Sequence, residues 1–139
     1  MNKTLNIGDN ASITHMFTEE GVALYATLST DTNPIHLDPE YAATTQFKQR
    51  LVHGMLVGGL FSSLIGTHLP GNGSIYMGQN LNFKSPVFFD MEIIARVEIT
   101  AIHATKPIIT LKTTCVDSSG TLLIDGEATV YVPWFKRDV

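Results

Sequence analysis

The sequence predicts an α+β domain, and two observations carry that prediction. Residues 53–67 form one apolar segment of helical character, and residues 73–132 read as successive strands in which apolar and polar side chains alternate. One buried helix followed by at least four antiparallel strands favours a sheet wrapped around that helix. A length of 139 residues fits a single domain that spans the whole chain, 1–139.

The first half of the chain reads as helices joined by a loop. Thr18 fits the N-cap of a helix to residue 29, with two acidic residues in the first turn and apolar residues at helical spacing. Asp38 and the proline after it suit the start of a short helix through about Gln46. Pro34 lacks an N–H and restrains the residue before it, so we expect residues 30–37 to form a loop.

The helix at 53–67 is apolar nearly all round, which predicts that it is buried. Its small residues cost helical stability but permit a sheet or a ligand to approach closely. Packing against a sheet is the commoner reason for such residues. They are Gly54, Gly58, Gly59, Ser62 and Ser63.

The strands follow a period of two. Residues 93–101 alternate, with Ile93, Ala95, Val97, Ile99 and Ala101 on one face. Runs at 107–116 and 121–132 are joined by Asp117-Ser118-Ser119-Gly120, a good hairpin turn.

Gln79 lies on the apolar face of the run 73–84. Either its amide faces a polar site, because an unsatisfied amide in a core is costly, or a bulge at Gly78 turns it outward.

Composition excludes several classes of protein. A net charge of −4 gives no basic footprint for nucleic acid. One cysteine, Cys115, forms no internal disulfide and fits a reducing compartment. The N-terminus lacks the apolar region of a secretory signal, and the weakly polar run 54–66 is shorter than the about 20 residues that cross a bilayer. We therefore expect a cytoplasmic protein without a membrane segment.

Asp31 and His36 are the candidate catalytic pair. They flank an Asn33-Pro34 pair on a segment that is neither continuous helix nor strand. A carboxylate is ionised at neutral pH, and an imidazole can hold or release a proton there, so the two side chains suffice for acid–base chemistry.

Other interpretations of these residues remain open. Asp31 could cap a turn and His36 could be an ordinary half-buried histidine. A metal site has ligand types available, but no paired spacing typical of zinc or iron supports it, so we expect no metal. A nucleophilic triad is disfavoured because Cys115 lies in a strand pattern and no Gly-x-Ser-x-Gly motif occurs. The possible metal ligands are His36, Asp38, His53 and His68.

The segment 25–42, YATLSTDTNPIHLDPEYA, resembles the hydratase 2 signature of the MaoC-like (R)-specific enoyl-CoA hydratases. The one departure is Thr30, where the pattern has glycine; a positive φ there would strain a β-branched residue. The resemblance continues through 51–56 and 69–89, and it is greatest to the short single-domain hydratases that supply polyhydroxyalkanoate monomers. The matching positions are Tyr25, Leu28, Ser29, Asp31, Asn33, Pro34, Ile35, His36 and Ala42.

This resemblance implies a hot-dog fold, in which a curved antiparallel sheet wraps around a long central helix, here 53–67. It also implies a homodimer whose sheets join edge to edge, which would cover an otherwise exposed strand. It implies no cofactor, since CoA is part of the substrate.

The resemblance further implies reversible syn addition of water to a trans-2-enoyl-CoA, giving the (R)-3-hydroxyacyl-CoA. Asp31 would act as general base, and His36 would position the water and help deliver a proton to C2. The N–H of Gly54 would bind the thioester oxygen as charge develops on it, a role that also suits a helix-terminal donor. Asn33 and Pro34 would hold the loop in shape.

The acyl chain and the CoA phosphates need sites of their own. Candidates for the acyl pocket lie on the helix and the neighbouring strands: Ser62, Ile65, Gln79 and Val130. Cations available for the phosphates are Lys48, Arg50, Lys84 and Lys106.

Three rival functions share this fold. A (3R)-hydroxyacyl-ACP dehydratase would run the same equilibrium on a carrier-protein thioester. A hot-dog thioesterase needs a carboxylate on the central helix, and 53–67 has none. A non-catalytic acyl-CoA-binding protein would have no use for an intact Asp31/His36 pair.

Overall fold

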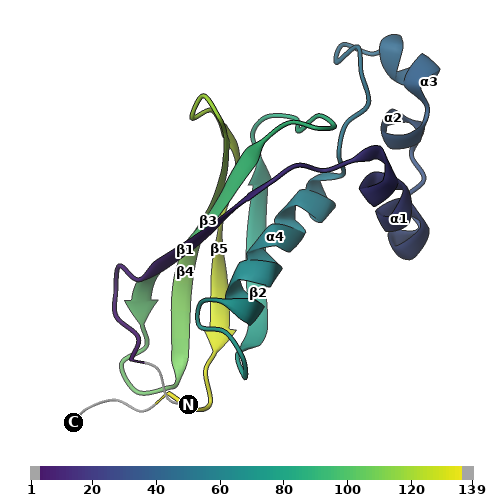
Figure 1. The fold of residues 1–139 in the computed structure, drawn as a ribbon. Helices are drawn as coiled ribbons and strands as arrows, with labels where there is room; N and C mark the ends of the chain where they lie inside the picture. Colours follow the sequence, from purple (N-terminus) through teal and green to yellow (C-terminus); the bar gives the residue numbers. More distant parts are fainter. Residues whose placement is uncertain (1–3, 136–139) are drawn as a thin grey trace.

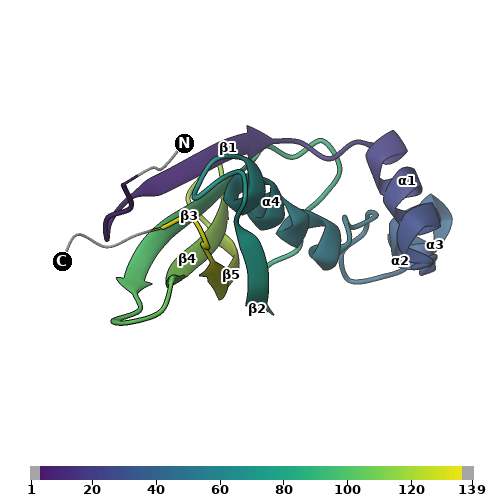
Figure 2. The ribbon, with the colours of Figure 1, turned by 90° about the horizontal axis from the view of Figure 1, so that it is seen from below.

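A five-stranded antiparallel sheet curves around one long helix (Figures 1 and 2). The structure, a computed structural model, describes residues 4–135. The strands are β1 (Asn10–His15), β2 (Ile75–Phe83), β3 (Ile93–Ile102), β4 (Ile108–Asp117) and β5 (Leu122–Tyr131), in the order β1-β3-β4-β5-β2. The central helix is α4 (Gly54–Thr67). The α+β class and the curved sheet around a central helix are confirmed.

Three short helices connect β1 to α4 and project beyond one end of the sheet (Figure 1). They are α1 (Glu19–Ser29), α2 (Pro34–Leu37) and α3 (Pro39–Ala43). Thr18 caps α1 as predicted, accepting a hydrogen bond from the Gly21 N–H at 3.1 Å. None of the helices within residues 4–135 has the length and apolar character needed to cross a membrane.

The expectation of a loop over 30–37 is wrong in its second half, which forms α2. Asn33 caps this single turn, and Pro34 occupies its first position, where a missing N–H costs nothing. Asp38 caps α3 as predicted, accepting from two backbone N–H groups, but that helix ends at Ala43 rather than near Gln46.

The helix α4 is buried along one stripe only, not all round. Its buried residues recur at helical spacing and pack in the apolar core with β3, β4 and β5: Val57, Leu60, Phe61, Leu64 and Ile65. The opposite side leaves Gly59, Ser62 and Ser63 exposed. The packing interpretation holds at Gly58, where a Cβ would lie 3.0 Å from the Leu81 side chain.

The predicted strands are present, and one more was missed. The strand β1 lies at a sheet edge against β3, outside the range 73–132 to which strands were assigned. Inward alternation on β3 holds through Ile99, but the register shifts before Ala101 and leaves that residue exposed. The hairpin turn between β4 and β5 is confirmed: Asp117 Oδ1 accepts from the Ser119 and Thr121 N–H groups, both at 2.9 Å.

Gln79 lies near a register irregularity, as one alternative expected, but that irregularity does not turn it outward. The β2–β5 register shifts between Tyr76 and Gly78, yet Gln79 still turns inward. Its side-chain amide donates to the hydroxyl of Thr113, a fully buried residue, at 2.9 Å and to the Asn80 carbonyl at 2.7 Å. Its oxygen accepts from the Tyr76 hydroxyl, so the half-buried amide is satisfied within the protein.

Candidate active site

Asp31 is held by a chain of side-chain-to-backbone hydrogen bonds after α1. Thr30 ends that helix in the left-handed region, with φ at 66°. The Asp31 N–H donates to Ser29 Oγ at 3.1 Å, and Asp31 Oδ1 accepts from the Asn33 N–H at 3.2 Å. The positive φ at Thr30 is therefore real, and the loop tolerates a β-branched residue where the pattern has glycine.

His36 is positioned by α2, whose first turn is set by Asn33 and Pro34. Asn33 Oδ1 accepts from the Ile35 N–H at 3.0 Å, which fixes the start of the turn. His36 Nδ1 bonds to the Leu51 carbonyl oxygen at 2.7 Å. Because a carbonyl only accepts, Nδ1 carries the hydrogen, and Nε2 of the neutral ring is left as an acceptor. Among residues 4–135, no hydrogen bond occupies that Nε2.

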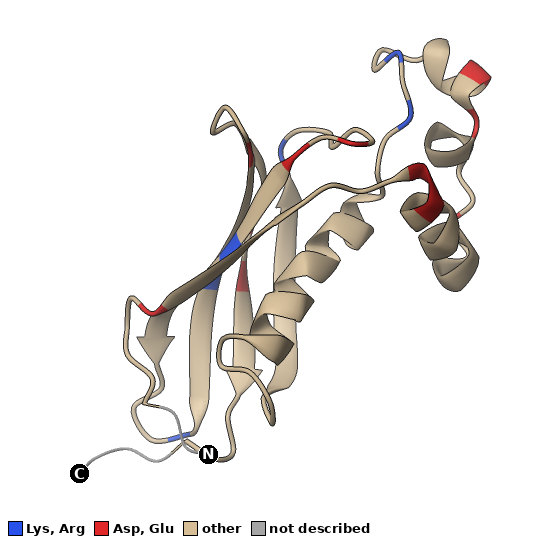
Figure 3. Ribbon diagram, viewed as in Figure 1, with Lys and Arg blue, Asp and Glu red and all other residues tan. Residues whose placement is uncertain are grey.

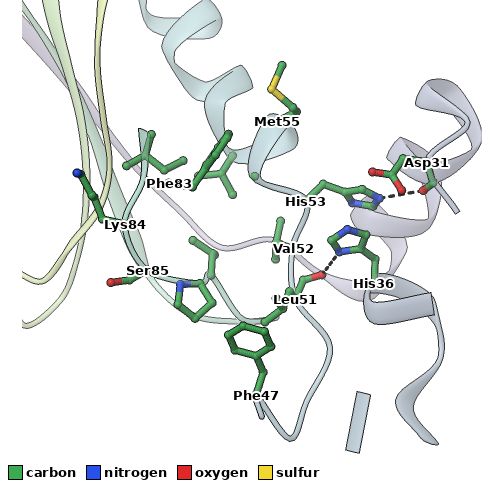
Figure 4. A pocket seen from close by; sticks show the side chains of 15 residues that line it. Asp31, His36, Phe47, Leu51, Val52, His53, Met55, Phe83, Lys84 and Ser85 are labelled. Atoms are coloured by element: carbon green, nitrogen blue, oxygen red, sulfur yellow. Dashed lines mark hydrogen bonds between the residues drawn. The ribbon is translucent and has the colours of Figure 1, made fainter. Parts of the chain in front are cut away.

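His53 is a member of the site that the sequence offered only as a possible metal ligand. It precedes α4, is only 2% exposed, and its Nε2 donates to the backbone oxygen of Asp31 at 3.0 Å. Its ring stacks on the His36 ring with centroids 3.8 Å apart (Figure 4). Tyr25 packs edge-on against it. The sequence also placed it next to Gly54 at the start of the helix, but it gave no indication of contacts with Asp31 and His36.

The functional atoms of Asp31, His36 and His53 converge. One carboxylate oxygen and one nitrogen of each ring lie within 4.8 Å of one another, a separation that a metal ion could also bridge. However, one nitrogen of each imidazole already binds a backbone carbonyl. The absence of a metal remains a prediction. Asp38, which the sequence also offered as a ligand, caps α3 instead.

The surroundings of His36 favour its neutral form. Burial lowers the pKa of His36 below its ordinary 6.5, and the neighbouring His53 lowers it further. The hydrogen bond to Leu51 and the charge of Asp31 raise the pKa but do not outweigh burial. The ring is therefore mainly neutral at pH 7, with Nε2 able to accept.

Gly54 supplies the third polar group. It is the first residue of α4, and its N-cap, His53, makes no side-chain capping bond. The Gly54 N–H is therefore a helix-terminal donor at the positive end of the dipole. The ring of Phe83 packs so closely that a Cβ at residue 54 would lie 2.6 Å from it.

These groups share one cavity of about 480 Å³. In Figure 4, Asp31, His36 and His53 lie on one side, and Phe83, Lys84 and Ser85 lie on the other. The lining is mostly apolar, which suits a ligand with an acyl portion. The structure thus brings together Asp31, His36 and Gly54, as the resemblance implied.

The predicted acyl-pocket residues lie elsewhere in this chain. Ser62 and Gln79 line a second groove of about 370 Å³ between α4 and β2, and Met55 lines both spaces. Ile65 and Val130 are buried in the core, 1% and 0% exposed. None of the four predicted residues lines the cavity that contains Asp31.

The predicted phosphate-binding cations also differ in their surroundings. Arg50 is already engaged: it pairs with Glu19 at 3.1 Å, donates to the Leu37 carbonyl at 3.4 Å and lies over the Phe89 ring. Lys84 lines the cavity. The helix α4 carries no charged residue, so it lacks the carboxylate that a thioesterase of this fold requires (Figure 3).

Comparison with known proteins gives consistent relatives. The chain is 50% identical over 131 residues to the (R)-specific enoyl-CoA hydratase of Aeromonas caviae, covering 94% of this chain and 98% of that protein. It is 42% identical over 132 residues to a mitochondrial 3-hydroxyacyl-[acyl-carrier-protein] dehydratase of Arabidopsis thaliana, covering 93% of this chain and 78% of the other.

Solved structures agree with this result. An (R)-hydratase from A. caviae involved in PHA biosynthesis superposes with a TM-score of 0.92, covering 94% of this chain and 99% of the other at 50% identity. An unliganded R-hydratase from Pseudomonas aeruginosa gives 0.88 at 41% identity, covering 93% and 83%. The family model described as a MaoC like domain matches residues 4–119. The chain therefore belongs to the MaoC-like domain family.

Proposed function

We propose that this protein is an (R)-specific enoyl-CoA hydratase, a hydro-lyase that adds water reversibly to trans-2-enoyl-CoA to give (R)-3-hydroxyacyl-CoA. The observation that carries the proposal is the meeting of Asp31, His36 and the Gly54 N–H at one apolar cavity. Relatives at 50% and 45% identity bear the name (R)-specific enoyl-CoA hydratase, which supports the same reaction.

The pair of Asp31 and His36 is suited to hold a water molecule as a nucleophile. An ionised carboxylate only accepts hydrogen bonds, and His36 Nε2 also accepts because Nδ1 donates to Leu51. A nitrogen of the His36 ring lies within 4.8 Å of an Asp31 carboxylate oxygen, and two acceptors at such a separation can each take one hydrogen of the same water at ordinary hydrogen-bond lengths. The lone pairs of the water oxygen then remain free to attack C3.

The tautomer of His36 constrains the proton path. As water attacks C3, one O–H bond breaks and its proton passes to the base, Asp31; C2 must gain a proton to complete the addition. A neutral His36 has no proton on Nε2, so the proton that reaches C2 is the one that water lost to Asp31, passed on directly or by way of His36. The net result is addition of H and OH with no co-reactant.

Charge that develops on the thioester oxygen would be stabilised by the Gly54 N–H. Removing a comparable donor in other enzymes costs about 10²–10³-fold in kcat. The missing side chain at Gly54 also lets the thioester approach, since Phe83 already fills the space beside it. Lys84, on the opposite side of the cavity, is the described cation best placed for the CoA phosphates.

The acyl pocket and the absence of a cofactor are part of the same proposal. Ser62, Ile65, Gln79 and Val130 remain our candidates for limiting the acyl chain, although they line no part of the Asp31 cavity within one chain. No cofactor is required, because CoA enters as part of the substrate. We place the protein in the reducing cytoplasm, which suits its single buried thiol, Cys115.

We also propose that the working protein is a homodimer joined at β2. This strand is at the sheet edge and exposes large apolar side chains, including Ile75, Met77 and Phe83. An exposed apolar edge invites pairing with a second copy. Light scattering of purified protein at several concentrations tests this. Met77→Lys is expected to give a monomer. Lys112→Met, which removes a charge on β4 instead of adding one on β2, is the control.

A second candidate function differs from the first only in the carrier of the acyl thioester, which would be acyl-carrier protein instead of CoA. The 42% identity to an acyl-carrier-protein dehydratase favours testing that substrate directly. Crotonyl-CoA and crotonyl-ACP would be compared by kcat/KM at equal enzyme concentration. A higher value for the ACP thioester would replace CoA hydration by the dehydratase function.

The decisive experiment follows the loss of enoyl-thioester absorbance with crotonyl-CoA, together with a chiral assay of the product. Asp31→Asn and His36→Ala are expected to lose about 10²–10⁴-fold in rate. Asp90→Asn and His68→Ala, exposed residues away from the cavity, are the matched controls and should retain activity. An (S)-alcohol, or no turnover by folded wild-type protein, would overturn the proposal.

A further inference from the structure

Among the described residues of the site, His53 is a buried titratable side chain, and the proposed reaction assigns it no role. It is 2% exposed and contacts both proposed catalytic residues: it donates to the Asp31 backbone and stacks on the His36 ring. It also makes an edge contact with Tyr25 on α1, with ring centroids 4.8 Å apart. A single side chain thus links the two acceptors that must hold one water.

The hydrogen bonding of the His53 ring costs folding free energy. Nε2 carries the hydrogen because its partner is a carbonyl, so Nδ1 is an acceptor, and that atom is buried with no hydrogen-bond partner among the described residues. Leaving a buried polar atom unsatisfied costs about 1–3 kcal/mol. An apolar residue of similar size would avoid this cost, so the Nε2–H donor and the flat ring must provide something that such a residue cannot.

His53 has no nitrogen available to a ligand, although its side chain lines the cavity. Nε2 is used by Asp31, and Nδ1 is buried. Any contribution of His53 to the reaction therefore passes through Asp31 and His36.

We propose that His53 is a positioning residue that sets the separation and orientation of the Asp31 carboxylate and the His36 ring. This inference rests on the proposed hydration. The Nε2–H fixes the backbone of Asp31, and hence the direction of its carboxylate. The ring face of His53 restricts rotation of His36, whose only other anchor in the described chain is the Leu51 carbonyl. Misplacing a reacting group by about 1 Å can cost about 100-fold in rate.

His53 also affects the protonation of His36. The groups facing His36 are Asp31 from the end of α1, which raises its pKa, and His53 from the start of α4, which lowers it. Arg50 binds the carbonyl of Leu37, the residue next to His36, and is itself paired with Glu19. Loss of His53 should therefore raise the pKa of His36, leaving less of the neutral form that accepts from water.

Two substitutions separate the contributions of the donor and the ring. His53→Gln keeps an N–H near the position of Nε2 but loses the ring, and His53→Phe keeps the ring but loses the donor. With crotonyl-CoA, His53→Phe should lower kcat by about 10–100-fold with KM changed less than about twofold. His53→Gln should fall between His53→Phe and the wild type. His68→Gln, exposed beyond the other end of α4, is the matched control and should behave as wild type.

The pKa of His36, followed by NMR titration of its ring proton, gives a readout that needs no substrate. It should move upward in His53→Phe, and the acidic limb of kcat/KM should move with it. If His53→Phe does not fold, His53→Gln is compared with His53→Asn, whose shorter amide cannot reach the Asp31 oxygen and should be slower.

Failure of this inference is distinguishable from failure of the proposed function. Wild-type protein without turnover would reject the hydratase, whatever the His53 variants do. An active wild type whose folded His53→Phe variant keeps both kcat and the His36 pKa would reject the positioning role. Equal rates for His53→Gln and His53→Asn would also reject it.

Discussion

Phe83 packs its ring against the Cα of Gly54, so closely that a Cβ at residue 54 would lie 2.6 Å from the ring. The two residues belong to β2 and α4, and both line the cavity that contains Asp31. The end of the helix is therefore open to a ligand only because residue 54 has no side chain.

Gly54→Ala should reduce kcat/KM for crotonyl-CoA by about tenfold or more, because the methyl group displaces Phe83 within the cavity. The unfolding free energy should change little, since the Phe83 ring is 53% exposed and can move. The loss of kcat/KM caused by Gly54→Ala should be smaller when Phe83 is already alanine than in the wild-type background. Steady-state kinetics on the four proteins of this cycle provide the check, and purely additive effects would contradict the proposed clash.

Activity should fall in acid as His36 takes up a proton. Burial lowers the pKa of His36 below 6.5, so the acidic limb of kcat/KM should lie below pH 6.5. The same shift acts on stability: the unfolded chain binds the proton more readily, so the unfolding free energy should fall as pH drops below 6.5. A pH–rate profile and urea titrations at pH 5 and 7, compared with His36→Gln, measure both effects. A limb above pH 6.5 would contradict this assignment.

Thr30→Gly should stabilise the protein. Thr30 has φ at 66°, a conformation that is strained for a β-branched residue and free of strain for glycine. Relief of about 1–2 kcal/mol is partly offset by the greater entropy of glycine in the unfolded chain, leaving a gain of about 0.5–1 kcal/mol. Thermal melting should show a higher Tm, and Thr32→Gly, whose residue has no positive φ, should show a lower one.

Gly126→Ala should be among the most damaging single-methyl additions in the chain. A Cβ at residue 126 would lie 2.0 Å from the backbone oxygen of Asn80 and 3.1 Å from the Gln79 amide nitrogen. Because β2 and β5 pair here, the backbone cannot yield without loss of register, and we expect a cost above about 3 kcal/mol. Gly66→Ala has open space and a helical backbone, so it should stabilise α4 by up to about 1 kcal/mol. Urea unfolding of both variants tests the contrast.

Hydration should continue after treatment with a strong chelator. Although Asp31, His36 and His53 offer metal-ligand types within 4.8 Å, the proposed chemistry uses them to hold water. The assay is the crotonyl-CoA rate before and after dialysis against EDTA, followed by addition of Zn²⁺. Activity lost on chelation and restored by metal would contradict the proposal that no cofactor is needed.

The parts that sequence reasoning predicted correctly are those whose cause is local. Helix α4 begins and ends close to 53–67 because periodicity and composition along a single segment determine it. Asp31 and His36 could be paired because both lie on one short stretch that the hydratase signature covers. The Asp117–Gly120 turn follows from the chemistry of four consecutive residues.

The parts that were missed depend on contacts between distant segments. β1 carries only Ala11 and Ile13 as half-buried apolar residues, and it becomes a strand by pairing with β3, whose paired residues lie 78 to 88 positions away. His53 joins the site through the backbone of Asp31 and the ring of His36, neither of which any local pattern indicates. The opposite error at α2 arose because Pro34 was taken as an interruption, whereas capping by Asn33 made it a helix start.

The orientation of the His36 ring has a consequence for inhibitor design. With Nδ1 turned toward Leu51, the catalytic edge of the cavity presents two acceptors, Asp31 and His36 Nε2, beside a single donor, the Gly54 N–H. A primary carboxamide has the complementary pattern, since its NH₂ group supplies two donors and its oxygen one acceptor. Fragments that attach such an amide to a short apolar tail would take the place of both the water and the thioester oxygen, whereas the corresponding carboxylic acids would be repelled by Asp31.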